Sequence, residues 1–208
     1  MNLKKRWSEL MLELGLKENV EMYESLISAY SEAHRHYHDL SHLQMVLKQF
    51  ASVEQLAENK SHVELALWFH DAVYKLFSTT NEKDSAKWAS DFLQASGATK
   101  DVVESVAGLI RATSHTSAAT SNDEKLIVDI DLSVLGQPQK VYEKYSIDVR
   151  REYRLVPQFI YNKKRSKILC SFMSKSRIFF FDEFEILLGK QAANNVHNEL
   201  LSLGVIKC

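Results

Sequence analysis

Hydrophobic residues recur every three or four positions through most of the chain, a spacing typical of helices that bury one face. The spacing is clear near the start, where Leu3, Trp7 and Leu10 share one face. It predicts helices over residues 3–14, 20–30, 40–50, 61–71, 80–97, 99–115, 124–136, 138–153, 168–173 and 182–203. Residues 177–181 fit either a short extended segment or a buried connector. The pattern therefore predicts about ten helices and no sheet.

Capping and breaking residues mark the ends of these helices. Sequences that fit a capping box, in which two side chains bond free backbone amides, occur at Ser61–Glu64, Thr79–Glu82 and Asp182–Glu185. Each box predicts the start of a helix. Pro138 can open a helix, and Pro157 interrupts it.

Composition favours the same architecture. The chain has six glycines and two prolines among 208 residues, so tight turns and hairpins are scarce. A hydrophobic content of 45% over this length can bury one substantial core. No internal repeat or Pro/Ser/Gly-rich linker divides the sequence. We therefore expect one all-α domain, a helical bundle over residues 1–208.

Charge, cysteine usage and hydropathy narrow the class of partner. The net charge of −1 does not favour binding to nucleic acid or to an anionic membrane. Cys170 and Cys208 do not have metal-finger spacing. The N-terminus lacks the apolar core of a signal peptide, and no apolar run reaches the length of a membrane span. We expect a cytoplasmic protein without a membrane partner, and the oligomeric state stays open.

Two apolar helices carry polar side chains that need compensation. His70 and Asp71 lie side by side within LALWFHDAVY, and Asp129 and Asp131 lie within EKLIVDIDLSVLG. Burial of such groups without partners would cost on the order of several kcal/mol. A divalent cation would compensate both pairs, since imidazole and carboxylate are its usual ligands. Alternatively, His70 pairs locally and Asp71 ends the helix.

Histidines gather ahead of one predicted helix. The segment SEAHRHYHDLSH holds four of the eight histidines of the chain: His34, His36, His38 and His42. His42 falls within the apolar spacing of the helix that follows, which favours a position inside the bundle. For His34 and His36 a surface patch is the simpler interpretation.

Taken in order, His42, His70–Asp71 and Asp131 resemble the signature of the HD superfamily of metal-dependent phosphohydrolases. Five blocks resemble one bacterial branch of predicted metal-dependent HD phosphohydrolases: RHYHDLSH, WFHDAVY, NEKDSA, DIDLSVLG and VRREY. The likeness extends to AANNVHNEL, and so covers nearly the whole chain. It implies an HD-type helical fold.

The resemblance also implies a ligand set. It assigns His42, His70, Asp71 and Asp131 as metal ligands, with His38 and Asp129 beside them. Superfamily members that hold two metals add two histidines before the distal aspartate, and only His115 lies there in this chain. One divalent ion is therefore expected, whether Mn, Mg, Fe, Co, Ni or Zn.

The implied chemistry is hydrolysis of a phosphate ester or anhydride of a small molecule, such as a nucleotide, by metal-activated water. Asp71 is expected to take part in catalysis, and Glu82 to act either as general base or as a helix-capping acid. The substrate-binding candidates are Arg35, His38, His115 and Arg150, with Arg111 a weaker one. The alternatives are a non-catalytic metal- or nucleotide-binding module and, less favoured, a di-iron oxygenase.

Overall fold

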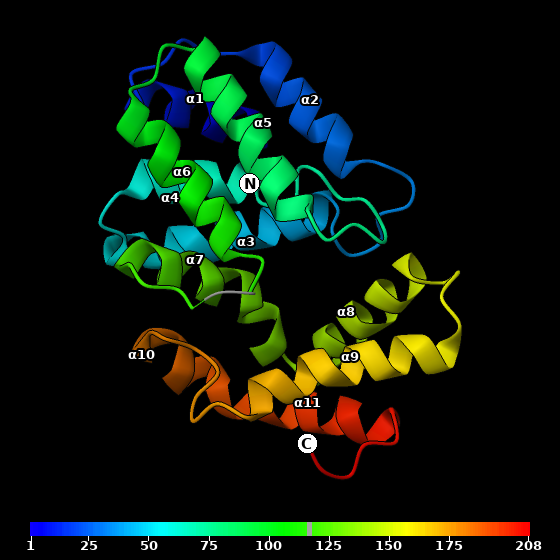
Figure 1. Ribbon diagram of the computed structural model, residues 1–208. Helices are drawn as coiled ribbons and strands as arrows, with labels where there is room; N and C mark the ends of the chain where they lie inside the picture. Colours follow the sequence, from blue (N-terminus) through cyan, green and yellow to red (C-terminus); the bar gives the residue numbers. More distant parts are fainter. Residues whose placement is uncertain (116–117) are drawn as a thin grey trace. The chain divides into compact units, whose positions relative to one another are not determined.

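The computed structural model describes residues 1–115 and 118–208, and it contains only helices and their connections (Figure 1). No strand occurs in these two ranges. The all-α prediction is confirmed. The helices run from α1 to α11, and α10 is a single short turn, so about ten helices of ordinary length are present, as predicted.

The chain divides into two compact units, Met1–Ile130 and Asp131–Cys208, where the sequence predicted one domain over 1–208. The boundary falls inside a helix, α7, and not in a linker. This explains why no compositional signal marks it, because a helix that crosses a boundary keeps its periodic pattern on both sides.

The first unit is built around α4. Its helices are α1 (Leu3–Glu13), α2 (Val20–Tyr30), α3 (Leu40–Val53), α4 (Lys60–Phe69), α5 (Asn81–Ala95), α6 (Lys100–Ala112) and α7 (Asn122–Leu132), with a short 3₁₀ turn, η1 (Glu54–Leu56). Helix α4 contacts α1, α3, α5 and α6. Every side chain from Leu65 to Phe69 is fully buried, as expected for a helix that is apolar on all sides.

Of the three helix starts predicted from capping boxes, the one at Asp182 coincides with the start of α10, and the other two differ from the observed starts by about one residue. Helix α4 begins at Lys60, and α5 begins at Asn81 after the N-cap residue Thr80. The N-cap residue is therefore Thr80 and not Thr79, the first residue of the predicted box. The hydroxyl of Thr80 donates to the carboxylate of Asp84 (3.2 Å), and Glu82 is not its partner. The prediction failed because several neighbouring polar residues could serve as the cap, and packing selects among them.

The second unit contains η2 (Ser133–Gly136), α8 (Gln139–Glu152), α9 (Gln158–Met173), α10 (Asp182–Phe184), the π-helical turn η3 (Glu185–Gly189) and α11 (Lys190–Ser202). Helix α11 packs against α8, α9, η2 and η3. Gly136 permits the contact of η2 with η3, because a Cβ atom there would lie 2.4 Å from Cβ of Leu188. Residues 177–181 form a connector, with Ile178 and Phe179 buried.

Cys170 on α9 and Cys208 form a disulfide, with a Cα–Cα distance of 5.3 Å. The sequence spacing did not indicate this pairing, because the two residues lie 38 positions apart. Disulfides are typical of oxidising compartments, so the expected cytoplasmic location stays a prediction. In the described part of the chain, none of the helices combines the length and apolar character needed to cross a membrane.

Candidate metal centre

Helix α3 presents His42 on its buried face. The carboxylate of Asp39 caps this helix by accepting the backbone N–H groups of Ser41 (2.8 Å) and His42 (3.3 Å). Leu43, Val46 and Leu47 bury the same helix in the core, and His42 is itself only 2% exposed. The prediction that His42 lies inside the bundle is therefore confirmed.

His70 follows the last residue of α4, and its orientation is set by a backbone contact. Nδ1 of His70 lies 2.8 Å from the carbonyl oxygen of Leu67 and therefore carries the ring proton. The lone pair of Nε2 is then directed away from that carbonyl. A histidine held in this way is prepared to act as a ligand through Nε2.

The carboxylate of Asp71 meets both imidazoles at one point. Its Oδ2 atom lies 3.3 Å from Nε2 of His42 and 3.2 Å from Nε2 of His70, and the two Nε2 atoms lie 3.0 Å apart. Burial alone would raise the pKa of Asp71. The neighbouring imidazoles of His70 and His42 outweigh this effect and hold the pKa of Asp71 well below its usual range. Asp71 is therefore a carboxylate at neutral pH.

These separations are those of neighbouring ligands on one ion. Two ligand atoms that lie about 2.1 Å from a metal, at right angles, are about 3.0 Å apart. The three atoms from His42, His70 and Asp71 are separated by 3.0–3.3 Å. The residues present therefore fit a divalent cation.

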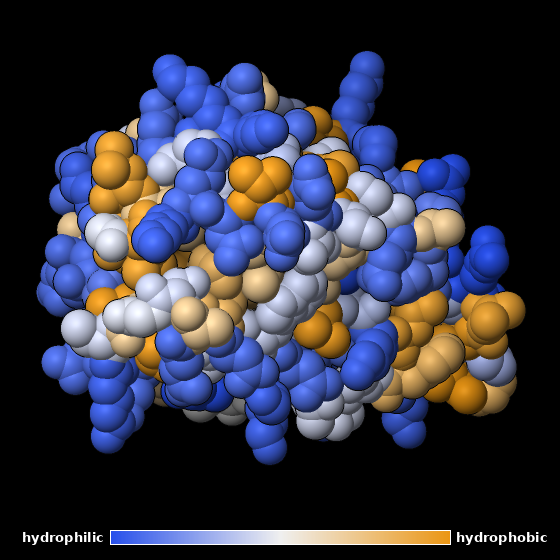
Figure 2. All heavy atoms as spheres, turned by 90° about the horizontal axis from the view of Figure 1, so that it is seen from above, coloured by the Kyte–Doolittle hydropathy of each residue, from blue (hydrophilic) through white to orange (hydrophobic). Residues whose placement is uncertain are grey.

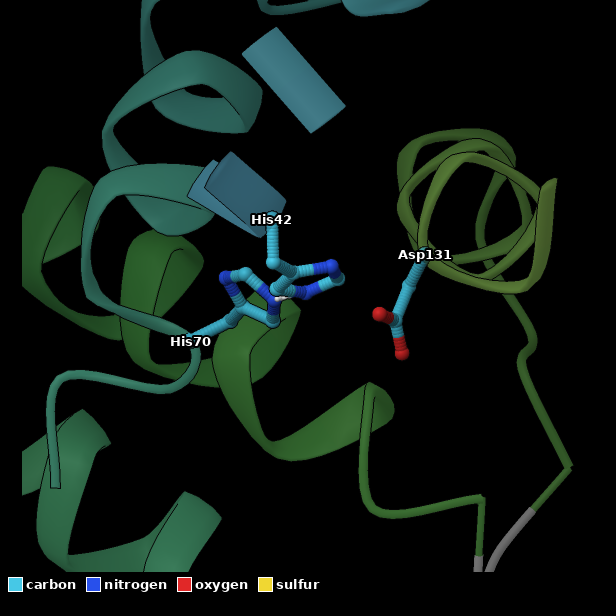
Figure 3. A group of neighbouring side chains, drawn as sticks. All are labelled: His42, His70 and Asp131. Carbon is cyan, nitrogen blue, oxygen red and sulfur yellow. Dashed lines mark hydrogen bonds between the residues drawn. The ribbon is translucent and has the colours of Figure 1, made fainter. Parts of the chain in front are cut away.

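Asp131 is carried by α7, whose start is anchored in the first unit. The buried carboxylate of Asp123 accepts the backbone N–H groups of Glu58 (2.8 Å) and Asn59 (2.9 Å). Asp131 directly follows Ile130, a fully buried residue on the same helix. One ligand atom from each of His42, His70 and Asp131 lies within 4.8 Å of the others, and Figure 3 shows the Asp131 carboxylate directed toward the imidazoles.

Arg35 positions the loop that follows His70. Its guanidinium donates to the carbonyl oxygens of Asp71 (2.6 Å) and Ala72 (2.9 Å), to that of His38 (3.0 Å) and to the carboxylate of Glu32 (3.0 Å). The side chain is fully buried, and the guanidinium lies over the ring of Tyr30 at 5.2 Å. The sequence suggested a substrate ligand. The structure instead gives Arg35 contacts that hold Asp71 in place.

Two further residues that support this loop were not recognised in the sequence as site residues. The hydroxyl of Tyr30 lies 3.3 Å from the amide nitrogen of Asp71, which donates to it. The buried hydroxyl of Ser85, on α5, accepts the N–H of Val73 (3.0 Å). The only available signal was a polar atom at an apolar helical position, and such positions are common without any role at a site.

The remaining predicted site residues lie in different surroundings. His38 stacks on the ring of Tyr74 (4.3 Å) and lies edge-on to His42 (5.9 Å). Glu82 is half-buried at the second position of α5. His115 is exposed after α6, and Asp129 is fully buried on α7.

Arg150 lies in the second unit, at the end of α8. It donates to the carbonyl oxygens of Tyr153 and Val156 and to the side chain of Gln158, and so closes the connection between α8 and α9. Its guanidinium also lies over the ring of Tyr161, 4.8 Å from the centroid.

Two imidazoles and two carboxylates form a donor set suited to Mn²⁺, Fe²⁺, Co²⁺, Ni²⁺ or Zn²⁺. This chemistry follows from the residues alone. No protein-family model matches the chain, and no similar curated protein or solved structure was found. The resemblance to the HD superfamily therefore stays an interpretation of the sequence motifs.

Proposed function

We propose that this chain is a metal-dependent phosphohydrolase of HD type that acts on a phosphate ester or anhydride of a small molecule. The observation that carries the proposal is the meeting of Nε2 of His42, Nε2 of His70 and Oδ2 of Asp71 within 3.0–3.3 Å, with Asp131 directed at the same point. The resemblance of the motif blocks adds the reaction class.

Some of the site residues would bind the metal ion, and others hold those ligands in position. A divalent ion held by this set would lower the pKa of water and polarise a phosphoryl oxygen. Asp71 supplies a full negative charge because its pKa is depressed. The carbonyl of Leu67 keeps the lone pair of His70 available, and Arg35 fixes the backbone at Asp71 and Ala72.

The residues around the proposed ligands have separate roles. His38, stacked on Tyr74 and beside His42, is the proposed contact for the substrate. Glu82 has no hydrogen bond or ion pair within residues 1–115 and 118–208, and its carboxylate is therefore available as a base. Arg35 acts as a positioning residue, since its donors are occupied by the protein.

Replacing Asp71 with asparagine tests this function. Asp71→Asn keeps the shape of the side chain and removes its charge. We expect the affinity for Mn²⁺ to fall by more than about 100-fold, beyond the 10–100-fold typical of residues that only support ligands. Phosphate release from a panel of nucleotides and sugar phosphates should fall with it. Asp91→Asn, an exposed carboxylate on α5, is the matched control and should change neither quantity.

The possible results separate the three interpretations of the site. Hydrolysis that requires Mn²⁺ and proceeds without oxygen supports the proposal. Metal bound by the wild type without turnover of any phosphorylated compound would favour the binding module. Turnover that requires oxygen would favour the oxygenase, and full metal content in Asp71→Asn would refute the ligand assignment.

A further inference from the structure

The second unit contains its own cavity, of about 470 Å³, between α8, α9 and the end of α11. Its lining includes three arginines of one helix end, Arg150, Arg151 and Arg154. Ile147 and Leu203 add apolar surface. Small-molecule sites commonly have volumes of about 300–1,000 Å³ and combine apolar walls with a few polar groups, as this cavity does.

Much of the positive charge in the cavity is available to a ligand. Arg151 makes one hydrogen bond, from Nη1 to Asp148 (2.9 Å), and its side chain is 62% exposed. Arg154 is exposed and forms no ion pair within the described residues. Arg150 is held in place by Gln158 and two backbone carbonyls, which fixes one wall of the cavity.

Two acidic groups near these arginines, Glu199 and Asp148, are already neutralised. Glu199 lines the cavity, and its carboxylate accepts from Nε (2.8 Å) and Nη2 (3.1 Å) of Arg165 and from the hydroxyl of Tyr142. Asp148 is shared by Lys144 and Arg151. Among the residues that line the cavity, the arginine charges therefore exceed the uncompensated carboxylate charge.

Tyr161 adds a hydrogen-bond donor. It lines the cavity, is 8% exposed, and its buried hydroxyl has no hydrogen-bond partner in the described part of the chain. Buried polar groups are nearly always hydrogen-bonded, so an unused hydroxyl at a cavity is a sign of a ligand. The cavity also includes Gln158, the first residue of α9, whose positive helix end no side chain caps.

We propose that this cavity is a binding site for the phosphate group of a small phosphorylated molecule, held by Arg151 and Arg154 with Tyr161 as a further donor. Arginine forks match phosphate oxygens, and an uncapped helix start favours an anion. The site lies wholly within residues 146–203 and uses none of the metal-ligand candidates, so it does not depend on the proposed hydrolysis.

Binding of adenosine monophosphate, with adenosine and inorganic phosphate for comparison, tests the site by calorimetry. It is measured in the full chain carrying Asp71→Asn, so that turnover does not interfere. We expect saturable binding of the monophosphate, at least tenfold weaker binding of adenosine, and measurable binding of phosphate. Arg151→Ala/Arg154→Ala should weaken binding of the monophosphate at least tenfold, and Tyr161→Phe about threefold.

Lys163→Ala/Lys164→Ala is the matched control, because it removes the same charge from exposed positions on α9 outside the cavity. It should change binding less than twofold. An equal loss in the control, or adenosine binding as tightly as its monophosphate, would overturn the proposal. If circular dichroism shows that the double arginine variant is misfolded, Arg154→Gln carries the test, because the side chain of Arg154 has no hydrogen bond or ion pair within the described residues that the substitution would break.

Discussion

The two units differ in charge and in how much apolar surface they leave open. Residues 1–130 hold 13 Lys and Arg against 19 Asp and Glu, a net charge of −6, whereas residues 131–208 hold 13 against 8, a net charge of +5. Of the fifteen exposed large hydrophobic side chains among the described residues, eleven belong to the second unit, including Leu155 and Phe159. Figure 2 shows hydrophobic side chains at its right-hand edge, the side where Figure 1 draws the connection between α8 and α9.

The interiors differ as well. In the first unit Trp7, Trp68 and Phe69 form an aromatic cluster, with the rings of Trp7 and Trp68 5.3 Å apart. The second unit instead buries an ion pair, Arg165–Glu199, and closes a long loop with a disulfide. A shorter chain buries a smaller fraction of its surface and relies more on polar networks and cross-links.

This difference suggests a division of roles. The candidate ligands His42, His70 and Asp71 belong to the unit whose core is packed with aromatic side chains, an environment that holds side chains in fixed positions. The basic unit contains the proposed phosphate site. The predictions below test whether the two units are stabilised in these different ways.

The largest effect on stability is expected from Trp68→Ala. The indole is fully buried, with rings of Trp7 and Tyr23 against it, so its removal leaves a large cavity. The free energy of unfolding should fall by about 3–5 kcal/mol. Trp88, on the same unit but half-buried, is the control, and Trp88→Ala should have a smaller effect. Similar losses from the two variants would contradict a core centred on Trp68.

A smaller loss in the free energy of unfolding, about 3 kcal/mol, is expected from Arg165→Met. This substitution leaves Glu199 buried without its cation but still bonded to Tyr142. All three tryptophans lie in the first unit, so their emission follows that unit, whereas far-UV circular dichroism follows both. The loss in free energy of unfolding should be larger when it is measured by circular dichroism than when it is measured by tryptophan emission. Equal losses by both signals would show that the units unfold together and would weaken the comparison.

The Arg165–Glu199 ion pair also predicts that the stability of the protein falls at acid pH. Burial would raise the pKa of Glu199, but the hydrogen bonds and charge of Arg165 lower it overall. The contribution of Glu199 to the free energy of unfolding is therefore complete above its unfolded pKa of about 4.3. It is lost as the pH falls through the lower pKa of the folded state. In Arg165→Met/Glu199→Gln this part of the acid dependence should disappear, and part of the stability lost in Arg165→Met should return.

The smallest effect is expected from Arg35→Lys. Lysine keeps the charge but has a single nitrogen, whereas the guanidinium uses two separate nitrogens, Nη1 and Nη2, to reach the carbonyl oxygens of Asp71 and Ala72. The affinity for Mn²⁺ should fall by about 10–100-fold, as for residues that orient ligands. Equilibrium dialysis measures it. An unchanged metal affinity with a raised KM would instead return Arg35 to the role of substrate ligand.

Local pattern was enough to predict most helices, because a helix is specified by neighbours three and four positions apart. The apolar run of α4 and the buried position of His42 follow from this spacing. Likewise, the buried polar pairs His70–Asp71 and Asp129–Asp131 could be recognised as needing compensation. The start of α9, ten residues before the predicted one, was missed because its buried and exposed apolar residues do not form a single stripe.

Tertiary structure decided what depends on residues far apart in the chain. The approach of His42 to His70 spans 28 positions, and the contact of Arg35 with Asp71 spans 36. Likewise, the pairing of Cys170 with Cys208 and the division of charge at Ile130 have no local signature. The sequence by itself determined which segments become helices and which polar groups need partners. Only the packing of those helices decided which partners they meet, because a hydrogen bond or ligand contact requires positions within a few tenths of an ångström that no periodic pattern specifies.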